Sequence, residues 1–296
     1  MSQKHRWGQK FIDKRDWKSY NEHLIQRGEY FINPAFLDTW IHELEEMNGG
    51  KIGQPFRCPN SMIEFLAIMK CKGFDYRSLE GILRGFSEML GGFPVISFSQ
   101  IRRRILTLTP SFDTNSKDLV VGVDGSGMKV TNRGDWIRYK WKVKRGWIKV
   151  VLLGDINGNI IDLRIGNENL DERAASRGMI RKNRKNIKKV LGDGLHDVEN
   201  TFNLCEKLNI QTGIKIRKNA VAKGLGRRPR EVRMYQELGY DEWANQNEYG
   251  LRWPATEGIF SAVKRIFGES VMSHKKRFMY HEVRLKFWAY QQLRNV

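Results

Sequence analysis

Residues 118–130, DLVVGVDGSGMKV, mark the point where the chain changes from helical to β periodicity. Two further β-rich runs follow, WIKVVLLGDI (147–156) and NIIDLRIGN (159–167). They flank Asn157-Gly158, a dipeptide with a strong preference for a two-residue hairpin turn. These residues predict three antiparallel strands in succession.

The chain beyond these strands alternates between helical and strand patterns. The expected elements are a basic helix over 173–189, a strand in KKVLGDGLH (188–196), a helix over 197–208, a strand in 211–219, and two closing helices over 254–267 and 276–293. This order predicts an α/β fold, a ribonuclease H-like mixed sheet flanked by helices. In such sheets, sites gather at the carboxyl ends of strands.

The first 110 residues have a helical pattern instead. Four segments, PAFLDTWIHELEEM, SMIEFLAIMKCK, YRSLEGILRGFSEML and FSQIRRRIL, each follow a capping signal. A polar, proline-led linker covers residues 110–118. We therefore expect an all-helical N-terminal domain (1–115) for DNA binding or dimerisation, and a ribonuclease H-like domain (116–296) with a basic insertion at about 215–250.

Three arginines lie in the last N-terminal helix. The final three helices could form a helix-turn-helix-like module, in which Arg102, Arg103 and Arg104 would face phosphates or a groove. Alternatively, the helices form a bundle that packs on the second domain or makes a dimer, and the arginines are only solvated. The sequence leaves both interpretations open.

The net charge of +19 is unevenly distributed. Residues 1–115 hold 16 Lys and Arg against 13 acidic residues, and residues 116–296 hold 36 against 20. Two runs are the most basic, 173–189 and 215–233, and the second includes Arg227 and Arg228. A charge run is often just a solvated face, but this density favours a polyanion such as double-stranded DNA as partner, with the second run a flexible loop that orders on it.

Several other classes of protein are disfavoured. No apolar run approaches the roughly 20 residues of a membrane span, and the first residues lack the apolar stretch of a signal peptide. The three cysteines show no zinc spacing, which indicates reduced thiols in a cytoplasmic protein. No GxGxxG or GxxxxGK[ST] motif predicts a nucleotide cofactor.

Two aspartates follow predicted strands, and Glu257 is expected one turn inside the helix that begins at Pro254. Asp124 could be an ordinary hairpin-turn residue, but a carboxylate after a buried run is costly unless it is paired or metal-bound. Asp193 could simply end its strand, although Gly194 beside it would let a ligand approach. Glu257 shares a narrow helical stripe with Lys264, which is either a solvated face or a substrate groove. Together they can supply the shared carboxylate oxygens that two Mg²⁺ ions need for phosphoryl transfer.

Four segments resemble the DDE transposases of prokaryotic insertion sequences: MIEFLAIMKCKGFDYRSLEGILRGF, RGWIKVVLLGDINGNIIDLRIGNENLDE, VLGDGLHDVENTF and YGLRWPATEGIFSAVKRIFGE. The last resembles the family's Tyr-x2-Arg-x3-Glu-x6-Lys signature. Tyr249-x2-Arg252 and Glu257-x6-Lys264 match it, but four residues rather than three separate Arg252 from Glu257.

The resemblance implies a metal-dependent transposase that cleaves DNA at element ends and joins the freed 3′-hydroxyl to target DNA. Asp124, Asp193 and Glu257 would be the catalytic, metal-binding residues for two Mg²⁺ ions, which Mn²⁺ could replace. Tyr249, Arg252 and Lys264 would contact phosphates. Because two ends are processed together, a homodimer on DNA is expected, in the prokaryotic cytoplasm and associated with the nucleoid.

Other carboxylates and functions compete with this assignment. Asp171 is the outsider expected to come nearest the metals, and His196 is expected to be at best an accessory polar residue. The protein could instead be a catalytically inactive or repurposed DNA-binding protein, or another nuclease of the same fold.

Overall fold

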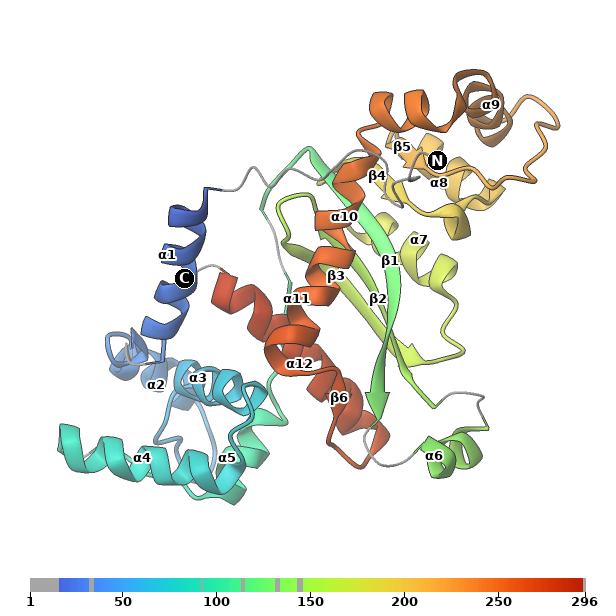
Figure 1. Ribbon diagram of the computed structural model, residues 1–296. Coiled ribbons are helices and arrows are strands. Elements are labelled where there is room, and N and C mark those ends of the chain that lie inside the picture. Colours follow the sequence, from blue (N-terminus) through green and yellow to red (C-terminus); the bar gives the residue numbers. More distant parts are fainter. Residues whose placement is uncertain are drawn as a thin grey trace, which may run out of the picture.

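The computed structural model describes residues 16–31, 35–91, 93–112, 115–130, 134–142 and 146–294 (Figure 1). The described elements before residue 110 are helical: α1 (Trp17–Glu29), the 3-10 turn η1 (Ala35–Leu37), α2 (Trp40–Asn48), α3 (Asn60–Cys71), α4 (Tyr76–Leu90) and α5 (Phe98–Ile105). The predicted all-helical N-terminal region is confirmed. The expected boundary at residue 115 stays a prediction.

Capping explains where two of these helices begin. Asp75 accepts hydrogen bonds from the backbone N–H groups of Arg77 and Ser78 at the start of α4. Ser97 and Gln100 form a reciprocal capping box at the start of α5. At the start of α3, the N-cap position is Pro59, which makes no side-chain cap, so the capping signal expected there is not used.

The sheet has the order β3-β2-β1-β4-β5. Its strands are β1 (Leu119–Val130), β2 (Ile148–Asp155), β3 (Ile160–Asn167), β4 (Ile187–Gly192) and β5 (Gln211–Ile214), and a short β6 (Ser270–Val271) pairs with the end of β1. The first three strands are antiparallel, whereas β4 runs parallel to β1 and β5 parallel to β4. The predicted mixed sheet is confirmed, with Gly158 of the Asn-Gly turn at φ 85°.

Helices cover both faces of the sheet. On one face, Val121 and Val123 pack with Met179 of α7 (Glu172–Lys182) and Cys205 of α8 (Glu199–Lys207). On the other, the β2 residues Val150 and Leu152 share a core with α11 (Glu257–Phe267) and α12 (Lys276–Arg294), and α10 (Arg252–Ala255) lies against β1 and β2. This alternation follows from the two-residue period of a strand.

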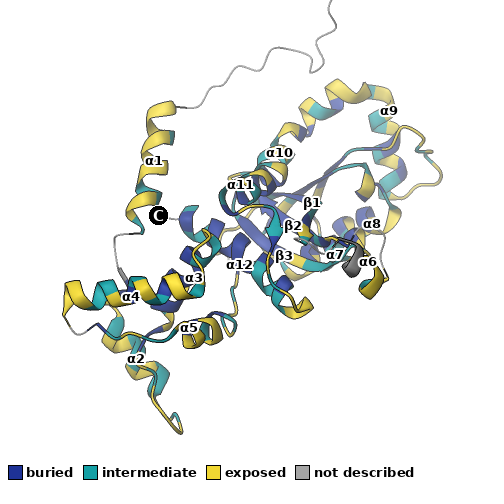
Figure 2. Cartoon of the chain, turned by 60° about the horizontal axis from the view of Figure 1, so that its bottom comes forward, coloured by how far each residue is buried: buried dark blue, intermediate teal, exposed yellow. Residues whose placement is uncertain are grey.

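The N-terminal helices join the second of these layers. Buried residues of α3 and α12 belong to one continuous hydrophobic core, which also reaches the β2 side of the sheet. Figure 2 shows dark-blue buried residues in the sheet and along α12, while much of α1 and α4 is exposed. The helical region is therefore anchored to the sheet through α12.

Three local features differ from the sequence-based expectation. The first part of the basic stretch at 215–233 is irregular as expected, but α9 (Arg227–Gln246) begins within it, with Gly239 at φ 74° interrupting the helix. A helix α6 (Gly134–Trp141) lies between β1 and β2. The closing helix expected over 254–267 is divided at Thr256 (φ −135°, ψ −74°), so Glu257 opens α11 instead of lying one turn inside a helix.

Candidate active site

Asp124 and Asp193 lie on neighbouring parallel strands. Val123 of β1 is paired with Gly192 of β4, so each aspartate comes one residue after this pair. Asp193 has extended backbone angles (φ −78°, ψ −179°), which continues the alternation of β4. Because side chains alternate along each strand and the two strands are paired in register, the two aspartate side chains point to the same face of the sheet. Adjacent strands lie about 4.8 Å apart.

Two glycines let α10 lie directly on that face. A Cβ atom added at Gly154 would lie 2.2 Å from the carbonyl oxygen of Ala255, and one added at Gly122 would lie 2.7 Å from the Cγ2 of Thr256. Any larger residue at these two positions would push the helix away. The close approach brings Arg252, at the start of α10, over Asp124.

Arg252 joins two of the predicted acids. Its guanidinium donates to Asp124 Oδ2 at 3.1 Å and also to Glu257 Oε1. The Arg252 side chain is only 16 % exposed. A single cation thus bridges carboxylates 133 positions apart in the chain, and the extra residue between Arg252 and Glu257 does not prevent their contact.

Burial and charge both act on Asp124. Burial is the main cause that raises its pKa to about 6, and the negative charges of Asp193 and Glu172 raise it further. The N–H of Gly125 and the guanidinium of Arg252 act in the opposite direction. Burial thus makes the ionised form of Asp124 costly, and additional positive charge beside it would be favourable.

Lys264 and Tyr249 complete the signature residues on this face. Lys264 of α11 donates to Ser126 Oγ at 2.8 Å, and Ser126 lies two residues beyond Asp124 on β1. Tyr249 is buried in the 3-10 turn η3 (Tyr249–Leu251), with its ring 5.7 Å from the Arg252 guanidinium carbon. Burial raises the pKa of Tyr249 to about 12. All four signature residues thus surround the Asp124 side of the sheet.

The carboxylates of this site suit a divalent cation in their chemistry but not in their present spacing. Among the described residues, no three His, Cys, Asp or Glu side chains are close enough together to hold a metal ion in this arrangement. The donor chemistry nevertheless fits, because carboxylate oxygens are the ligands that hard divalent cations prefer. The guanidinium of Arg252 stands between Asp124 and Glu257 as their present counter-ion.

The other arginines expected to bind DNA have different surroundings. Arg104 donates to the carbonyl oxygen of Cys58 and to Asn60 Oδ1, so it holds the helical region together. Arg102 and Arg103 are both exposed, and the guanidinium of Arg102 lies over the ring of Phe278, at 5.5 Å.

Arg227 and Arg228 are also engaged within the fold. Arg228 makes two hydrogen bonds to the carboxylate of Asp197, which is buried, and Arg227 pairs with Glu231 of the same helix. The five arginines of these two groups are therefore not gathered at the Asp124 face, and their contact with DNA stays a prediction.

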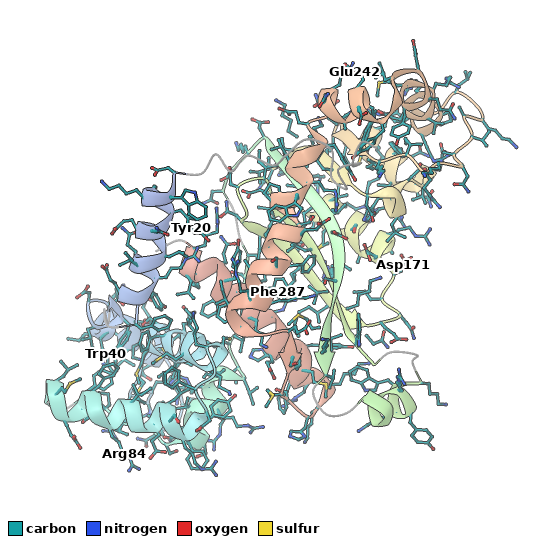
Figure 3. All side chains as sticks on the ribbon, in the orientation of Figure 1. Tyr20, Trp40, Arg84, Asp171, Glu242 and Phe287 are labelled. Carbon is teal, nitrogen blue, oxygen red and sulfur yellow. The ribbon has the colours of Figure 1, made fainter. Side chains whose placement is uncertain are left out.

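Glu172 lies near the aspartates and was not singled out by sequence, whereas Asp171 and His196 were considered as neighbours of the site. Asp171, labelled in Figure 3, caps α7 by accepting from the N–H groups of Arg173 and Ala174. The next residue, Glu172, instead points inward and influences Asp124. His196 is fully buried, with Nε2 3.8 Å from Glu172 Oε1. An acid in the first turn of a helix carries no sequence signal that distinguishes an inward from an outward side chain.

Two solved structures resemble the chain at 10 % identity. One is titled as the piggyBac transposase synaptic complex with hairpin DNA (TM-score 0.39; 90 % of this chain, 74 % of that one). The other is a simian T-cell lymphotropic virus intasome with PP2A regulatory subunit B56 gamma (TM-score 0.26; 70 % and 72 %). Both TM-scores are too low for either structure to inform the function of this chain.

Two family models identify the family to which the chain belongs. A model described as "Transposase DDE domain" matches residues 25–133, and a second model of the same description matches residues 115–291. The second match alone covers more than half of the chain and includes Asp124, Asp193, Arg252, Glu257 and Lys264. The chain therefore belongs to the family of transposase DDE domains.

Proposed function

We propose that this DDE transposase cleaves DNA at the ends of a prokaryotic insertion sequence and transfers the freed strand to target DNA, with Asp124, Asp193 and Glu257 as its catalytic carboxylates. One observation carries the proposal. Asp124 and Asp193 follow paired residues of adjacent parallel strands, and Arg252 connects Asp124 with Glu257. Three acids from distant parts of the chain are thereby brought to one face.

The same three residues would hold divalent metal, with two Mg²⁺ ions expected and Mn²⁺ as a substitute. Bound ions would activate water and stabilise the leaving 3′-oxygen. The raised pKa of Asp124 supports this assignment, because its main cause is burial of a carboxylate that added positive charge would stabilise. With metal as the counter-ion of the carboxylates, Arg252 would be available to a backbone phosphate.

The remaining signature residues would orient the DNA. Lys264 lies beside Ser126, two residues from Asp124, where its ammonium can meet a phosphate next to the scissile bond. The tyrosine ring of Tyr249 packs beside Arg252 and would keep that guanidinium aimed at the same place. These roles need no nucleophilic side chain.

The rest of the molecule would bind and align the DNA. The excess positive charge after residue 115 favours double-stranded DNA as the partner of the catalytic part, including the basic stretch near 215–250. We propose that residues 1–115 bind DNA or mediate dimerisation, with Arg103 as an exposed contact. A homodimer would act on two ends, in the cytoplasm and near the nucleoid. No helix in the described part of the chain is long and apolar enough to span a membrane.

A cleavage and joining assay tests the proposal. The full chain is incubated with linear DNA that carries candidate element ends, with Mg²⁺, with Mn²⁺, or with EDTA. We expect nicking and strand joining with either metal, no reaction with EDTA, and loss of both activities in Asp193→Asn with DNA binding retained.

Asp162→Asn is the matched control, because Asp162 is a buried acid on β3, away from the paired residues of β1 and β4. Retained activity in Asp193→Asn would refute the catalytic assignment. DNA binding without cleavage by the wild type would favour an inactive DNA-binding protein. Cleavage without joining would favour another nuclease of this fold.

A further inference from the structure

Each of the two aspartates has a glycine neighbour on its strand. Gly125 follows Asp124, and Gly192 precedes Asp193, so both glycines face the opposite side of the sheet from the aspartates. On that side of the sheet, Glu172 lies against Gly125 and His196 lies against Gly192. A Cβ atom added at Gly125 would lie 2.3 Å from Glu172 Oε2, and one added at Gly192 would lie 3.3 Å from the ring of His196.

Glu172 is placed in this space by the start of α7. Its side chain is 9 % exposed, and Oε2 accepts from Lys149 Nζ at 2.9 Å. Asp171 already caps the helix, so Glu172 is not needed for that purpose. The helix dipole would favour an acid here in water as well, and it gives no reason to bury the carboxylate against β1.

His196 closes the other side of this buried cluster. It is 0 % exposed, and neither ring nitrogen has a hydrogen-bond partner among the described residues. Its Nε2 is directed at Glu172 Oε1 across 3.8 Å, a distance too long for a hydrogen bond. An unpaired imidazole and a buried carboxylate therefore lie directly behind the two aspartates.

We infer that Glu172 is a positioning residue of the metal site. It packs against Gly125, supports Asp124 from the reverse face of the sheet, and adds negative charge that strengthens divalent-cation binding at Asp124 and Asp193. Lys149 weakens this effect by partly neutralising Glu172, and His196 fills the space behind Asp193. This inference rests on the proposed function, since it requires that Asp124 and Asp193 bind metal.

Mn²⁺ binding to the full chain, measured by calorimetry and by the electron paramagnetic resonance of free Mn²⁺, tests the inference without an activity assay. We expect Glu172→Gln to weaken Mn²⁺ binding about tenfold, as removal of outer partners of a metal site does. Glu172→Asp, which restores the charge, should recover most of the affinity. Lys149→Gln should change the affinity in the opposite direction and tighten binding.

The opposite changes in Mn²⁺ affinity expected for Glu172→Gln and Lys149→Gln distinguish this role from a purely structural one. If Glu172 and Lys149 were only a stabilising ion pair, loss of either partner would weaken Mn²⁺ binding or leave it unchanged. Asp162→Asn is the matched control, because Asp162 has an 8 % exposed side chain and pairs with Lys182 at 3.2 Å, and it should leave Mn²⁺ affinity unchanged.

Failure of this inference can be distinguished from failure of the proposed function. If Asp124→Asn and Asp193→Asn abolish Mn²⁺ binding while Glu172→Gln binds as tightly as wild type, the inference is wrong and the proposed function stands. If the two aspartate variants bind Mn²⁺ like wild type, the proposed metal site itself is wrong. Should Glu172→Gln fail to fold, Lys149→Gln still decides, because unchanged or weakened binding in that variant contradicts the inference.

Discussion

Replacement of Arg252 by Gln should make the metal-free protein less stable and make the proposed metal site bind Mn²⁺ more tightly. The guanidinium pairs with Asp124, whose side chain is 19 % exposed, and with Glu257, which is 46 % exposed. A hydrogen bond to a charged group contributes about 1.5–3 kcal/mol where it is well buried. The half-exposed pair with Glu257 adds only about 0–1 kcal/mol.

The expected loss without metal is therefore about 2–3 kcal/mol in the free energy of unfolding. In the wild type, the proposed divalent cation would bind the two carboxylates at the expense of these same interactions with the guanidinium. Because 1.4 kcal/mol corresponds to a tenfold change in affinity, Arg252→Gln should bind Mn²⁺ roughly 30- to 100-fold more tightly.

The assay is thermal and urea unfolding at pH 8 with and without Mn²⁺, together with calorimetric Mn²⁺ titration. Arg228→Gln is the matched control, because Arg228 is similarly buried (18 % exposed) and pairs with the buried Asp197. It should lose stability without any change in Mn²⁺ affinity. A destabilised Arg252→Gln whose Mn²⁺ affinity is equal to or weaker than that of the wild type would refute the reasoning.

Three further predictions concern Asp124, the helix that lies on the sheet, and the N-terminal arginines. The pKa of Asp124 is raised to about 6, so its contribution to stability is largest below about pH 4 and is lost as pH rises through 6. For the same reason, Mn²⁺ affinity should fall about tenfold per pH unit below 6. Urea unfolding and Mn²⁺ titration between pH 4 and 8 measure the two effects, and a pH-independent affinity would contradict the prediction. Gly154→Ala should destabilise the protein by about 1–3 kcal/mol through overpacking against α10. Gly178→Ala in α7, where an added Cβ has open space, should be neutral or stabilising. Urea unfolding measures both variants, and equal effects would contradict the prediction. Arg103→Ala should lower DNA affinity and reduce the salt dependence of DNA binding by about one phosphate contact, without changing the melting temperature. Arg104→Ala should instead lower the melting temperature, because it loses the hydrogen bonds to Cys58 and Asn60. Filter binding at several salt concentrations and thermal melts test the two variants, and the reverse pattern would overturn the assignment.

Local sequence signals were sufficient for the fold and for the acidic residues at its strands. The Asn157-Gly158 turn and the strand periodicity are properties of a few neighbouring residues, so three antiparallel strands followed by alternating helices and strands could be predicted. The short apolar runs before Asp124 and Asp193 likewise predicted that each carboxylate follows a buried β run. That β4 lies beside β1 could not be predicted from chain order, because the sheet order is β3-β2-β1-β4-β5.

What surrounds these acids depends on contacts between distant segments. Arg252 could be assigned to a phosphate from its motif, but its pairing with Asp124 requires that α10 lie on Gly122 and Gly154, more than ninety residues earlier in the chain. Glu172 is one acid beside another in the sequence, and only the packing of α7 against Gly125 turns it toward Asp124. Sequence periodicity determines which face of an element is apolar, whereas the partner of a polar side chain is determined by which element covers that face.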